Sequence, residues 1–346
     1  MTIGIIFGSK SYEHEISIVS SISMKKVLKN NLEYIFIDQY RDIYHIPSSK
    51  INSKLFSSGE YKKFDKLQIS KGGFFKSGLF GNKKLDIDVV LNLTHGGDGE
   101  DGVLASMFEF FNIAFIGPRN EACVVSMDKY ITKSYASNCC VKTLPCSYIS
   151  SDERDNLNIE KYPIIVKPTK LGSSIGVSIV KNEDELEYAL DVAFEFDNSV
   201  IIEPFIANVK EYNLAGCKID GKFNFSIVEE PTKDEFLDFE KKYLDFARTS
   251  QVLKANIDDN LINKLKENFT KIYNNTFDGS LIRCDFFVID NEVYLNEINS
   301  IPGSMANYLF EDFNLLINSL ANSLPKLRDI KIDYTYVNKI QNAKGK

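Results

Sequence analysis

The stretch "IRCDFFVIDNEVYLNEINSIPGS", residues 282–304, decides how the end of this chain folds. Aromatic and branched residues flank the polar break "DNE", a pattern that predicts two antiparallel strands joined by a tight turn. If the turn has three residues, as we expect, Asp285 lies directly opposite Glu297. Arg283 and Asn299 then share that face, whereas a two-residue turn would put the two carboxylates on opposite faces.

An opposed carboxylate pair needs a positive partner, because like charges facing each other destabilise a sheet. The oxygens of Asp285, Glu297 and Asn299 are hard ligands, which suit Mg²⁺ bound jointly by carboxylates and nucleotide phosphates. The alternative is a solvated edge hairpin whose charges only protect it from aggregation. This stretch alone is compatible with both interpretations.

The composition predicts a globular protein of two or three domains. The 346 residues are 44% hydrophobic and 26% charged, which allows a sizeable core. A net charge of −7 argues against non-specific nucleic-acid binding. No apolar run approaches the ~20 residues of a membrane span, and three dispersed histidines argue against a zinc site. We expect a cytoplasmic protein with reduced thiols, because there is no signal-peptide pattern and the six cysteines form no CxxC pair.

Alternating strands and helices in residues 1–117 predict an α/β unit with a parallel sheet. The expected strands are 3–8, 34–39, 85–93 and 113–117, and the expected helices are 17–29 and 103–111. A dehydrogenase interpretation fails here, because the first strand is not followed by the G-x-G-x-x-G fingerprint.

Beyond a Gly-Pro breaker at residues 117–118, the pattern predicts further strands and helices. We expect helices at 121–137, 182–194, 261–273 and 309–324, and strands at 163–168, 176–181 and 199–205. Asn182 is a candidate N-cap. The charge-rich segment 229–250 is expected to be mobile without ligands, and the polar end 337–346 to be frayed.

Two loops carry groups suited to a ligand. In "KPTKLGSSIGVSIV", residues 167–180, two glycines frame two serines, so backbone N–H groups can approach a phosphate while Lys167 supplies positive charge. An ordinary hairpin turn is the alternative, and a P-loop is excluded because a strand follows. "LTHGGDGEDG", residues 93–102, ends a parallel strand, where ligands of open α/β sheets bind. His95 could serve such a site or a helix cap.

Two other places are weaker signals. Glu13 and His14 lie before the first helix and could face a ligand, whereas Glu15 is explained by the helix dipole alone. The strand end "SVIIEPFI", at Glu203, could meet a planar heterocycle such as adenine. The ends of core strands look much the same.

Seven motifs occur along the chain: "EHEIS", "THGGDGEDG", "SMDKYITK", "VKPTKLGSSIGVS", "VIIEPFI", "FEKKY" and the opening hairpin. Together they resemble the D-alanine–D-alanine ligases of the ATP-grasp superfamily, over nearly the whole chain to about residue 325. The resemblance implies an α/β, three-domain ATP-grasp fold with ATP between the second and third domains. The implied domains are an N-terminal one at 1–117, a central one at 118–202 and a catalytic one at 203–330, before a tail at 331–346.

The resemblance also implies a role for individual residues. ATP would be bound by Lys129, Lys167, Lys242 and Ser174 at the phosphates, by Glu203, Phe205 and Ile206 at the adenine, and by Glu211 at the ribose. Two Mg²⁺ ions, or Mn²⁺ in their place, would be held by Asp285, Glu297 and Asn299. D-Alanine would meet Glu13, His95 and Glu100 in the first site, a loop-closing triad of Glu13, Ser173 and Tyr243, an oxyanion hole of Arg283 and the Gly303 N–H, and Tyr308 in the second site.

The implied activity is ATP-dependent ligation of two D-alanine molecules through an acyl phosphate, for peptidoglycan synthesis, in a homodimer without membrane or nucleic-acid partners. Three departures from the family pattern stand out: Tyr308 replaces a small hydroxyl residue, the interval from Asp285 to Glu297 is one residue shorter, and the stretch before Glu211 is one longer. The alternatives are another ATP-grasp carboxylate–amine ligase and a non-catalytic nucleotide-binding homologue.

Overall fold

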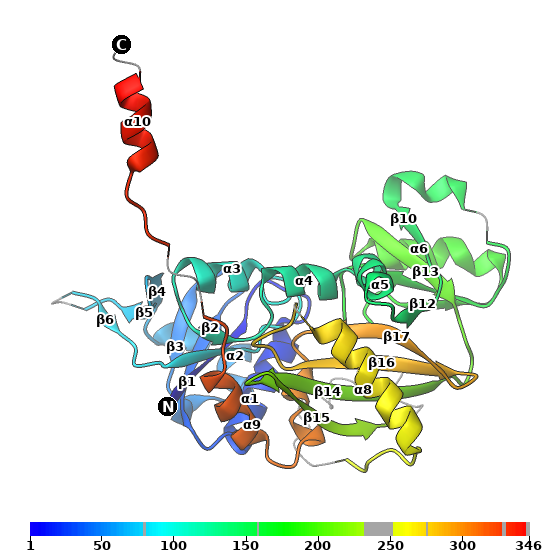
Figure 1. Cartoon of the computed structure of the whole chain (residues 1–346), viewed down its shortest axis with the longest axis horizontal. Helices are drawn as coiled ribbons and strands as arrows, with labels where there is room; N and C mark the ends of the chain where they lie inside the picture. The colour runs from blue at the N-terminus through cyan, green and yellow to red at the C-terminus, as the bar shows by residue number, and fades with distance from the viewer. Residues whose placement is uncertain (79–80, 158, 232–251, 275, 327–329, 344–346) are drawn as a thin grey trace.

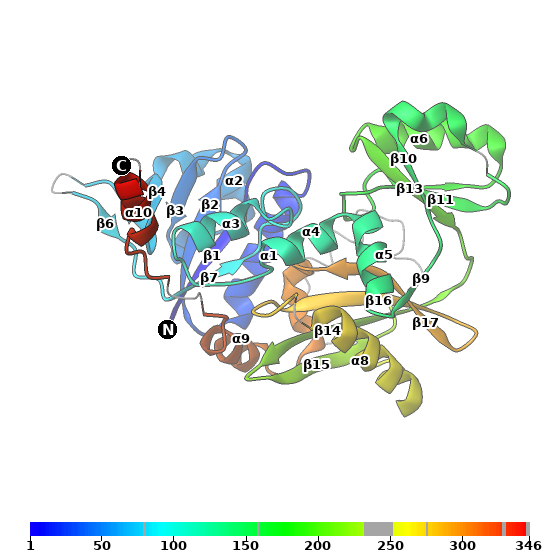
Figure 2. The same cartoon turned by 45° about the horizontal axis from the view of Figure 1, so that its top comes forward.

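The computed structural model describes residues 1–78, 81–157, 159–231, 252–274, 276–326 and 330–343. Its strands form four sheets and its helices pack against them, which confirms a mixed α/β fold. Figures 1 and 2 show the N-terminal sheet at one end of the molecule and a smaller lobe at the other, with a third, mostly antiparallel sheet beside both.

The N-terminal sheet has the strand order β3-β2-β1-β7-β8, and its inner strands are parallel, as predicted. Its elements are β1 (Thr2–Gly8), α1 (His14–Val27), β2 (Asn31–Ile37), the antiparallel edge strand β3 (Ile43–Ile46), η1 (Ser48–Lys50), α2 (Ser53–Ser57), η2 (Glu60–Lys63), β7 (Val89–Asn92), α3 (Val103–Phe110) and β8 (Phe115–Ile116). Strands β1 and β2 are buried on both faces, and alternate residues belong to two apolar cores, one on each side of the sheet.

The predicted strand 85–93 is wrong in its first half. The Leu85 N–H bonds to the Phe74 carbonyl at 2.8 Å, so this part of the chain leaves the parallel sheet. It runs beside a small antiparallel sheet that the sequence pattern did not predict, made of β4 (Leu67–Ser70), β5 (Gly73–Lys76) and β6 (Lys83–Lys84).

The smaller lobe holds an antiparallel sheet of order β10-β13-β11-β12 with one helix on it. Its elements are β10 (Ser147–Ser150), η3 (Ser151–Asn156), β11 (Ile164–Pro168), β12 (Ser178–Val180), η4 (Glu183–Glu185), α6 (Leu186–Phe194) and β13 (Ser199–Pro204). The predicted strands here are confirmed. The helix begins at Leu186 rather than directly after Asn182, because a 3₁₀ turn comes between them.

The predicted helix 121–137 is two helices, α4 (Asn120–Met127) and α5 (Lys129–Asn138). Asp128 between them is extended, with φ −94° and ψ 112°, and its carboxylate accepts the N–H groups of Tyr130 and Ile131. The break follows from this residue, because an Asp side chain that caps a new helix competes with helix continuation.

The third sheet has the order β15-β14-β16-β17-β9. Its elements are β9 (Lys142–Thr143), β14 (Lys210–Ile219), β15 (Lys222–Glu229), α8 (Asp259–Tyr273), β16 (Ile282–Ile289), β17 (Glu292–Asn299), η6 (Gly303–Leu309) and α9 (Phe313–Asn322). The predicted helix 309–324 is therefore shorter, because Leu309 ends η6 and residues 310–312 are not helical.

The β16–β17 hairpin corrects the predicted turn. Ile289 pairs with Glu292, so the turn has two residues, Asp290 and Asn291, both left-handed with φ 49° and 62°. A register shift between Asp285 and Phe286 then restores the pairing of Asp285 with Glu297. The shift is a β-bulge in which two residues of one strand oppose one residue of the other. The predicted shared face is confirmed, but for a different reason.

The cores do not follow the order of the chain. Helix α9 and η6 pack into the same apolar cluster as β1 and β2, while α4 and α5 pack with the third sheet and α8. The domain boundaries at 117 and 202 stay a prediction.

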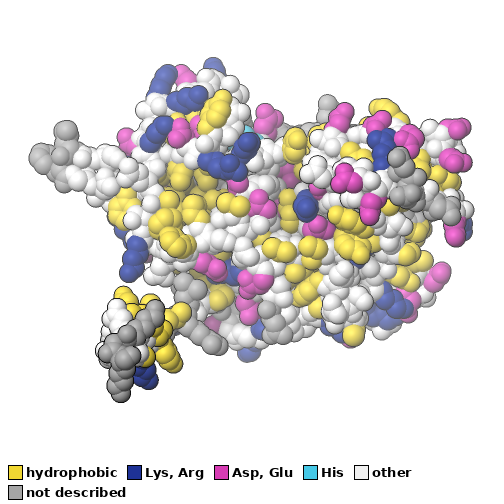
Figure 3. All heavy atoms as spheres, turned by 90° about the horizontal axis from the view of Figure 1, so that it is seen from above, with side chains coloured by type: hydrophobic (Ala, Val, Ile, Leu, Met, Phe, Trp, Pro, Cys, Tyr) yellow, Lys and Arg dark blue, Asp and Glu magenta, His cyan; other side chains and the backbone are white. Residues whose placement is uncertain are grey.

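The predicted frayed end is wrong for the residues that the structure describes, because Thr335–Ala343 form helix α10. It stands away from the body in Figure 1, and Figure 3 shows its hydrophobic side chains exposed. Among the described residues, none of the helices has the length and apolar character needed to cross a membrane.

Candidate active site

A cavity of about 450 Å³ is lined by residues from all three of the larger sheets and their loops. With one exception, every predicted site residue that the structure describes lines it: Glu13, His95, Glu100, Lys129, Lys167, Ser173, Ser174, Phe205, Ile206, Glu211, Arg283, Asp285, Glu297, Asn299, Gly303 and Tyr308. Lys242, Tyr243 and most of the segment 229–250 lie outside the described residues.

The hairpin places its charged groups together on one wall of the cavity. Arg283 donates from Nε and Nη2 to the two oxygens of Asp285, both at 2.7 Å, and Asn299 Nδ2 donates to Asp285 Oδ2 at 2.9 Å. Asp285 is only 2% exposed. Burial raises the pKa of its carboxyl, Arg283 opposes this, and Glu297 raises it further. The pair therefore favours an additional cation.

The donor set fits a metal shared with a ligand. Within the described ranges, no group of three or more His, Cys, Asp or Glu side chains gathers to hold a metal by itself. Two carboxylates and one amide oxygen fit Mg²⁺ that takes its remaining ligands from phosphates and water.

Glu13 and Glu100 form a second acidic pair in the cavity, on the loops that follow β1 and β7 of the N-terminal sheet. Glu13 is the N-cap residue of α1, but its carboxylate accepts the Ser173 hydroxyl at 2.5 Å. A Cβ at Gly172 would lie 3.1 Å from Glu13 Oε1, so glycine permits this approach. Glu100 accepts the Gly96 N–H at 2.7 Å and the Ile301 N–H at 3.3 Å.

Burial changes the protonation of this pair. Desolvation raises the pKa of Glu100 to about 8, and the nearby Glu13 carboxylate adds to the rise. Desolvation likewise raises the pKa of Glu13, against the hydrogen bond from Ser173 and the charge of Lys129. Two buried acids that resist ionisation suit a cationic ligand group, such as an ammonium.

The glycine-rich loop joins β11 to β12, as predicted, and bends through two left-handed serines. Ser173 and Ser174 have φ 55° and 58°. Lys129 Nζ donates to the Leu171 carbonyl at 2.5 Å, so this lysine lies directly under the loop. The loop contacts Glu13 at its tip, which closes it over the cavity.

Glu203 is the exception among the described site residues, because it does not line the cavity. Its carboxylate lies between Lys167 Nζ, at 2.6 Å, and Lys133 Nζ. Lys133 also donates to the Leu144 carbonyl at 2.8 Å. Burial alone would raise the pKa of Glu203, but the two lysines together lower it. The side chain of Glu203 therefore anchors Lys167, and the predicted place of Glu203 at the adenine stays a prediction.

His95 contacts the segment that carries Gly303. Its Nε2 lies 2.9 Å from Ser20 Oγ, which also accepts the Ser304 N–H at 3.3 Å. Desolvation lowers the pKa of His95 to about 4, so the ring is neutral at pH 7. Ser304 begins three consecutive left-handed residues, with φ 47°, 53° and 49°. His95 therefore supports this strained turn as well as the cavity.

Comparison with known proteins identifies the family. The model of the D-Ala D-Ala ligase N-terminus matches residues 2–118, and that of the C-terminus matches residues 150–314. The chain belongs to the D-alanine–D-alanine ligase family. It is 59% identical to the D-alanine–D-alanine ligase of Wolinella succinogenes over 346 residues, all of both chains, and 59% identical over 347 residues to that of a Sulfurovum species, again all of both. The crystal structure of the Helicobacter pylori D-alanine–D-alanine ligase is 50% identical, with a TM-score of 0.86 over 95% of this chain and 100% of that chain.

The hairpin shows how this D-alanine–D-alanine ligase accommodates one departure from the family pattern. The interval from Asp285 to Glu297 is shorter, yet the bulge keeps both carboxylates on one face. Tyr308, the second departure, is buried and lies with its hydroxyl 3.4 Å from Arg283 Nη1. A phenol therefore occupies the place beside the arginine of the proposed oxyanion hole.

Sequence reasoning missed several residues of this ligase site. Asn213, Glu229 and Asn296 line the cavity, and Lys133 lies behind it. Lys133 follows Lys129 by four positions on α5, a spacing that places both on one helix face and could have identified it. Asn296 depends on the bulge, for which the sequence holds no comparable signal.

Proposed function

We propose that the chain joins two D-alanine molecules to D-alanyl-D-alanine with conversion of ATP to ADP and phosphate, which supplies a dipeptide for peptidoglycan. One observation carries the proposal: the paired carboxylates of the hairpin, the glycine-rich loop and the acidic pair of Glu13 and Glu100 line one cavity. A phosphate site, a metal site and an ammonium site thus adjoin one another.

ATP binds along the wall formed by the glycine-rich loop and the residues that follow β13. Lys129, Lys167 and the N–H groups around Ser174 face its phosphates, while Phe205 and Ile206 lie at the adenine end. Glu211 lies at the ribose. Lys242 at the phosphates and Tyr243 in the loop-closing triad stay predictions from the resemblance, because both lie outside the described residues.

Asp285, Glu297 and Asn299 would hold Mg²⁺, or Mn²⁺ in its place. A metal held there would neutralise phosphate charge, which phosphoryl transfer needs more than a protein nucleophile. Arg283 already compensates Asp285 through two hydrogen bonds, so it orients this carboxylate. Loss of the Asp285 carboxylate would therefore disturb both the metal site and the position of Arg283.

The reaction has two steps. The carboxylate of the first D-alanine, whose ammonium lies near Glu13, attacks the γ-phosphorus of ATP, releases ADP and becomes an acyl phosphate. The amine of the second D-alanine then attacks the acyl carbon, and phosphate leaves as the amide forms. Arg283 and the Gly303 N–H stabilise the negative oxygen of the tetrahedral intermediate, where preorganised donors are most effective.

Tyr308 lies in the second site. Its hydroxyl, beside Arg283, donates to the carboxylate of the second D-alanine in place of the small hydroxyl residue usual in the family. A bulky phenol narrows this pocket, so we expect a small second substrate. A cytoplasmic location, expected from the sequence pattern, and a homodimeric state, implied by the resemblance, remain predictions.

The test is ADP release and dipeptide formation by the purified chain with ATP, Mg²⁺ and D-alanine, with L-alanine as the matched control. We expect one ADP for each D-alanyl-D-alanine and none with L-alanine. Turnover with L-amino acids in preference would instead identify another carboxylate–amine ligase. Nucleotide binding without turnover on any amino acid would identify a non-catalytic homologue.

A further inference from the structure

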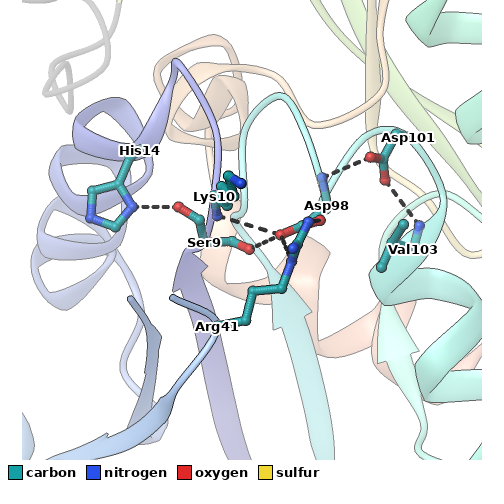
Figure 4. A network of polar contacts seen from close by, with 7 residues as sticks. All are labelled: Ser9, Lys10, His14, Arg41, Asp98, Asp101 and Val103. Carbon is teal, nitrogen blue, oxygen red and sulfur yellow. Dashed lines mark hydrogen bonds and ion pairs between the residues drawn. The ribbon is translucent and has the colours of Figure 1, made fainter. Parts of the chain in front are cut away.

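A polar network lies next to the cavity on the N-terminal sheet and has no part in the reaction above (Figure 4). Its centre is the Asp98 carboxylate, which is almost fully buried. Arg41 donates to its two oxygens, from Nε at 2.9 Å and from Nη2 at 2.8 Å. The Ser9 hydroxyl and the Lys10 N–H donate to Oδ2 as well, the latter at 3.4 Å.

The network joins three separate segments of chain. Ser9 and Lys10 lie in the β1–α1 loop, which leads directly to Glu13. Arg41 lies in the turn between β2 and β3, and Asp98 lies two residues before Glu100. Asp98 is therefore the point at which the loop of Glu13 is bonded to the loop of Glu100.

The two loops also touch directly. A Cβ on Gly96 would lie 2.4 Å from Ser11 Oγ and 2.8 Å from Glu13 Oε2, so there is no free space between them. Since Glu13 and Glu100 face one ligand group, a small change in the separation of these loops would change the geometry of both carboxylates. The loop of Asp98 is further fixed by Asp101, which accepts the Asp98 N–H at 2.9 Å (Figure 4).

The backbone at the network is held in conformations that it would not adopt alone. Ser9, Arg41 and Asp98 are all left-handed, with φ 73°, 67° and 65°. Such conformations are unfavourable for residues other than glycine, and least so for Asp and Asn. The hydrogen bonds to Asp98 therefore offset backbone strain in three segments at once. His14, which the sequence suggested could face a ligand, belongs to this region instead, with Nδ1 2.6 Å from the Ser9 carbonyl.

We propose that Asp98 and Arg41 are positioning residues for the first D-alanine, because they hold the loops of Glu13 and Glu100 at a fixed separation. This inference rests on the proposed function. Neither residue touches substrate, and both act by fixing the loops of Glu13 and Glu100. Their loss therefore changes the affinity for the first D-alanine while leaving the ATP site intact.

The experiment compares Asp98→Asn and Arg41→Gln with the wild-type chain in steady-state ligation assays. Asn tolerates the left-handed backbone but loses the ion pair with Arg41. We expect the KM for the first D-alanine to rise about tenfold in each variant, as for the loss of a charge-assisted hydrogen bond. The KM for ATP and kcat should change less than about twofold. Arg41 is 58% exposed, so its variant should fold even where Asp98→Asn does not.

The matched control is Asp42→Asn, which removes the exposed ion pair of Asp42 with Lys66, 2.6 Å apart, from the same turn as Arg41. It should leave all constants unchanged. Unchanged D-alanine KM values in both test variants, or an equal rise in the ATP KM, would overturn the inference while the proposed function stands. Absence of ligation by the wild-type chain would overturn both.

Discussion

At the scale of single residues, the site is defined by buried carboxylic acids, which ionise less readily than exposed ones. Glu100 is buried and its pKa is raised to about 8, chiefly by desolvation. The folded chain therefore keeps a proton on this group between about pH 4.5 and pH 8, where the unfolded chain has lost it. By linkage, this group's contribution to the free energy of unfolding falls as pH rises through that range.

We expect Glu100→Gln to remove this dependence. The variant should gain thermal stability relative to the wild type as pH rises from 5 to 8, by up to a few kcal/mol at the upper end, because a neutral amide carries no desolvated charge. Thermal unfolding of both proteins across this range measures it. Parallel pH profiles of the two melting temperatures would show that Glu100 ionises normally.

The buried cluster of Glu203 with Lys133 and Lys167 predicts that substitutions at Lys133 and Glu203 have non-additive effects on the free energy of unfolding. Lys133→Met leaves the Glu203 carboxylate with one cation instead of two and should destabilise the fold by about 3 kcal/mol. Glu203→Gln should cost less stability in the Lys133→Met background than in the wild type, because its ion pair with Lys133 is already absent there. Urea unfolding of the two single variants and the double variant measures this, and strictly additive losses would contradict it.

At the scale of elements, the hairpin shows how the shared face of Asp285 and Glu297 was predicted correctly although the predicted turn length was wrong. Two residues at the turn put Asp285 and Glu297 out of register, and the bulge at Asn296 brings them back. Asn296 and Glu297 then both line the cavity, as expected where two residues oppose one.

Changes of strand length test this register. Deleting Asn296 removes the bulge but moves Glu297 into the regular position opposite Asp285, so ligation should fall by no more than about tenfold. Inserting Ala after Asn296 moves Glu297 to the other face and should reduce ligation by more than about a hundredfold. Ligation rates of these two variants check the prediction. Equal activity of the two would mean that the strand absorbs length changes without altering its face.

The local sequence pattern predicted most strands and the position of the site, because the alternation of apolar and polar residues and the turn residues depend only on neighbouring positions in the chain. It predicted the shared face of Asp285 and Glu297 but not the bulge, which depends on pairing across two strands. The Asp290-Asn291 pair, which tolerates left-handed backbone, was a usable signal for the shorter turn. The orientation of Glu203 was not predictable, because it depends on Lys133 from a distant helix.

At the scale of the whole molecule, the packing of helices ignores the boundaries suggested by the sequence. Helix α9, near the end of the chain, shares a core with β1 at its beginning, whereas α10 has no buried residue among those described. Tyr336 on α10 is 79% exposed. The packing around the cavity therefore requires the chain up to the end of α9.

Removal of residues 327–346 should leave both kcat and the melting temperature unchanged within error, because α10 contributes no buried surface. Ligation assays and thermal unfolding of the truncated chain measure this. A fall in the melting temperature would show that the end of the chain stabilises the folded protein.

We infer that the opposed carboxylates of the hairpin hold a divalent cation together with the nucleotide. Electron paramagnetic resonance can measure Mn²⁺ bound to the chain in the presence of a non-hydrolysable ATP analogue, for the wild type and for Asp285→Asn. We expect Mn²⁺ binding to the variant to weaken at least about tenfold, since it loses a carboxylate ligand. Equal Mn²⁺ affinity and stoichiometry in the two proteins would contradict the account.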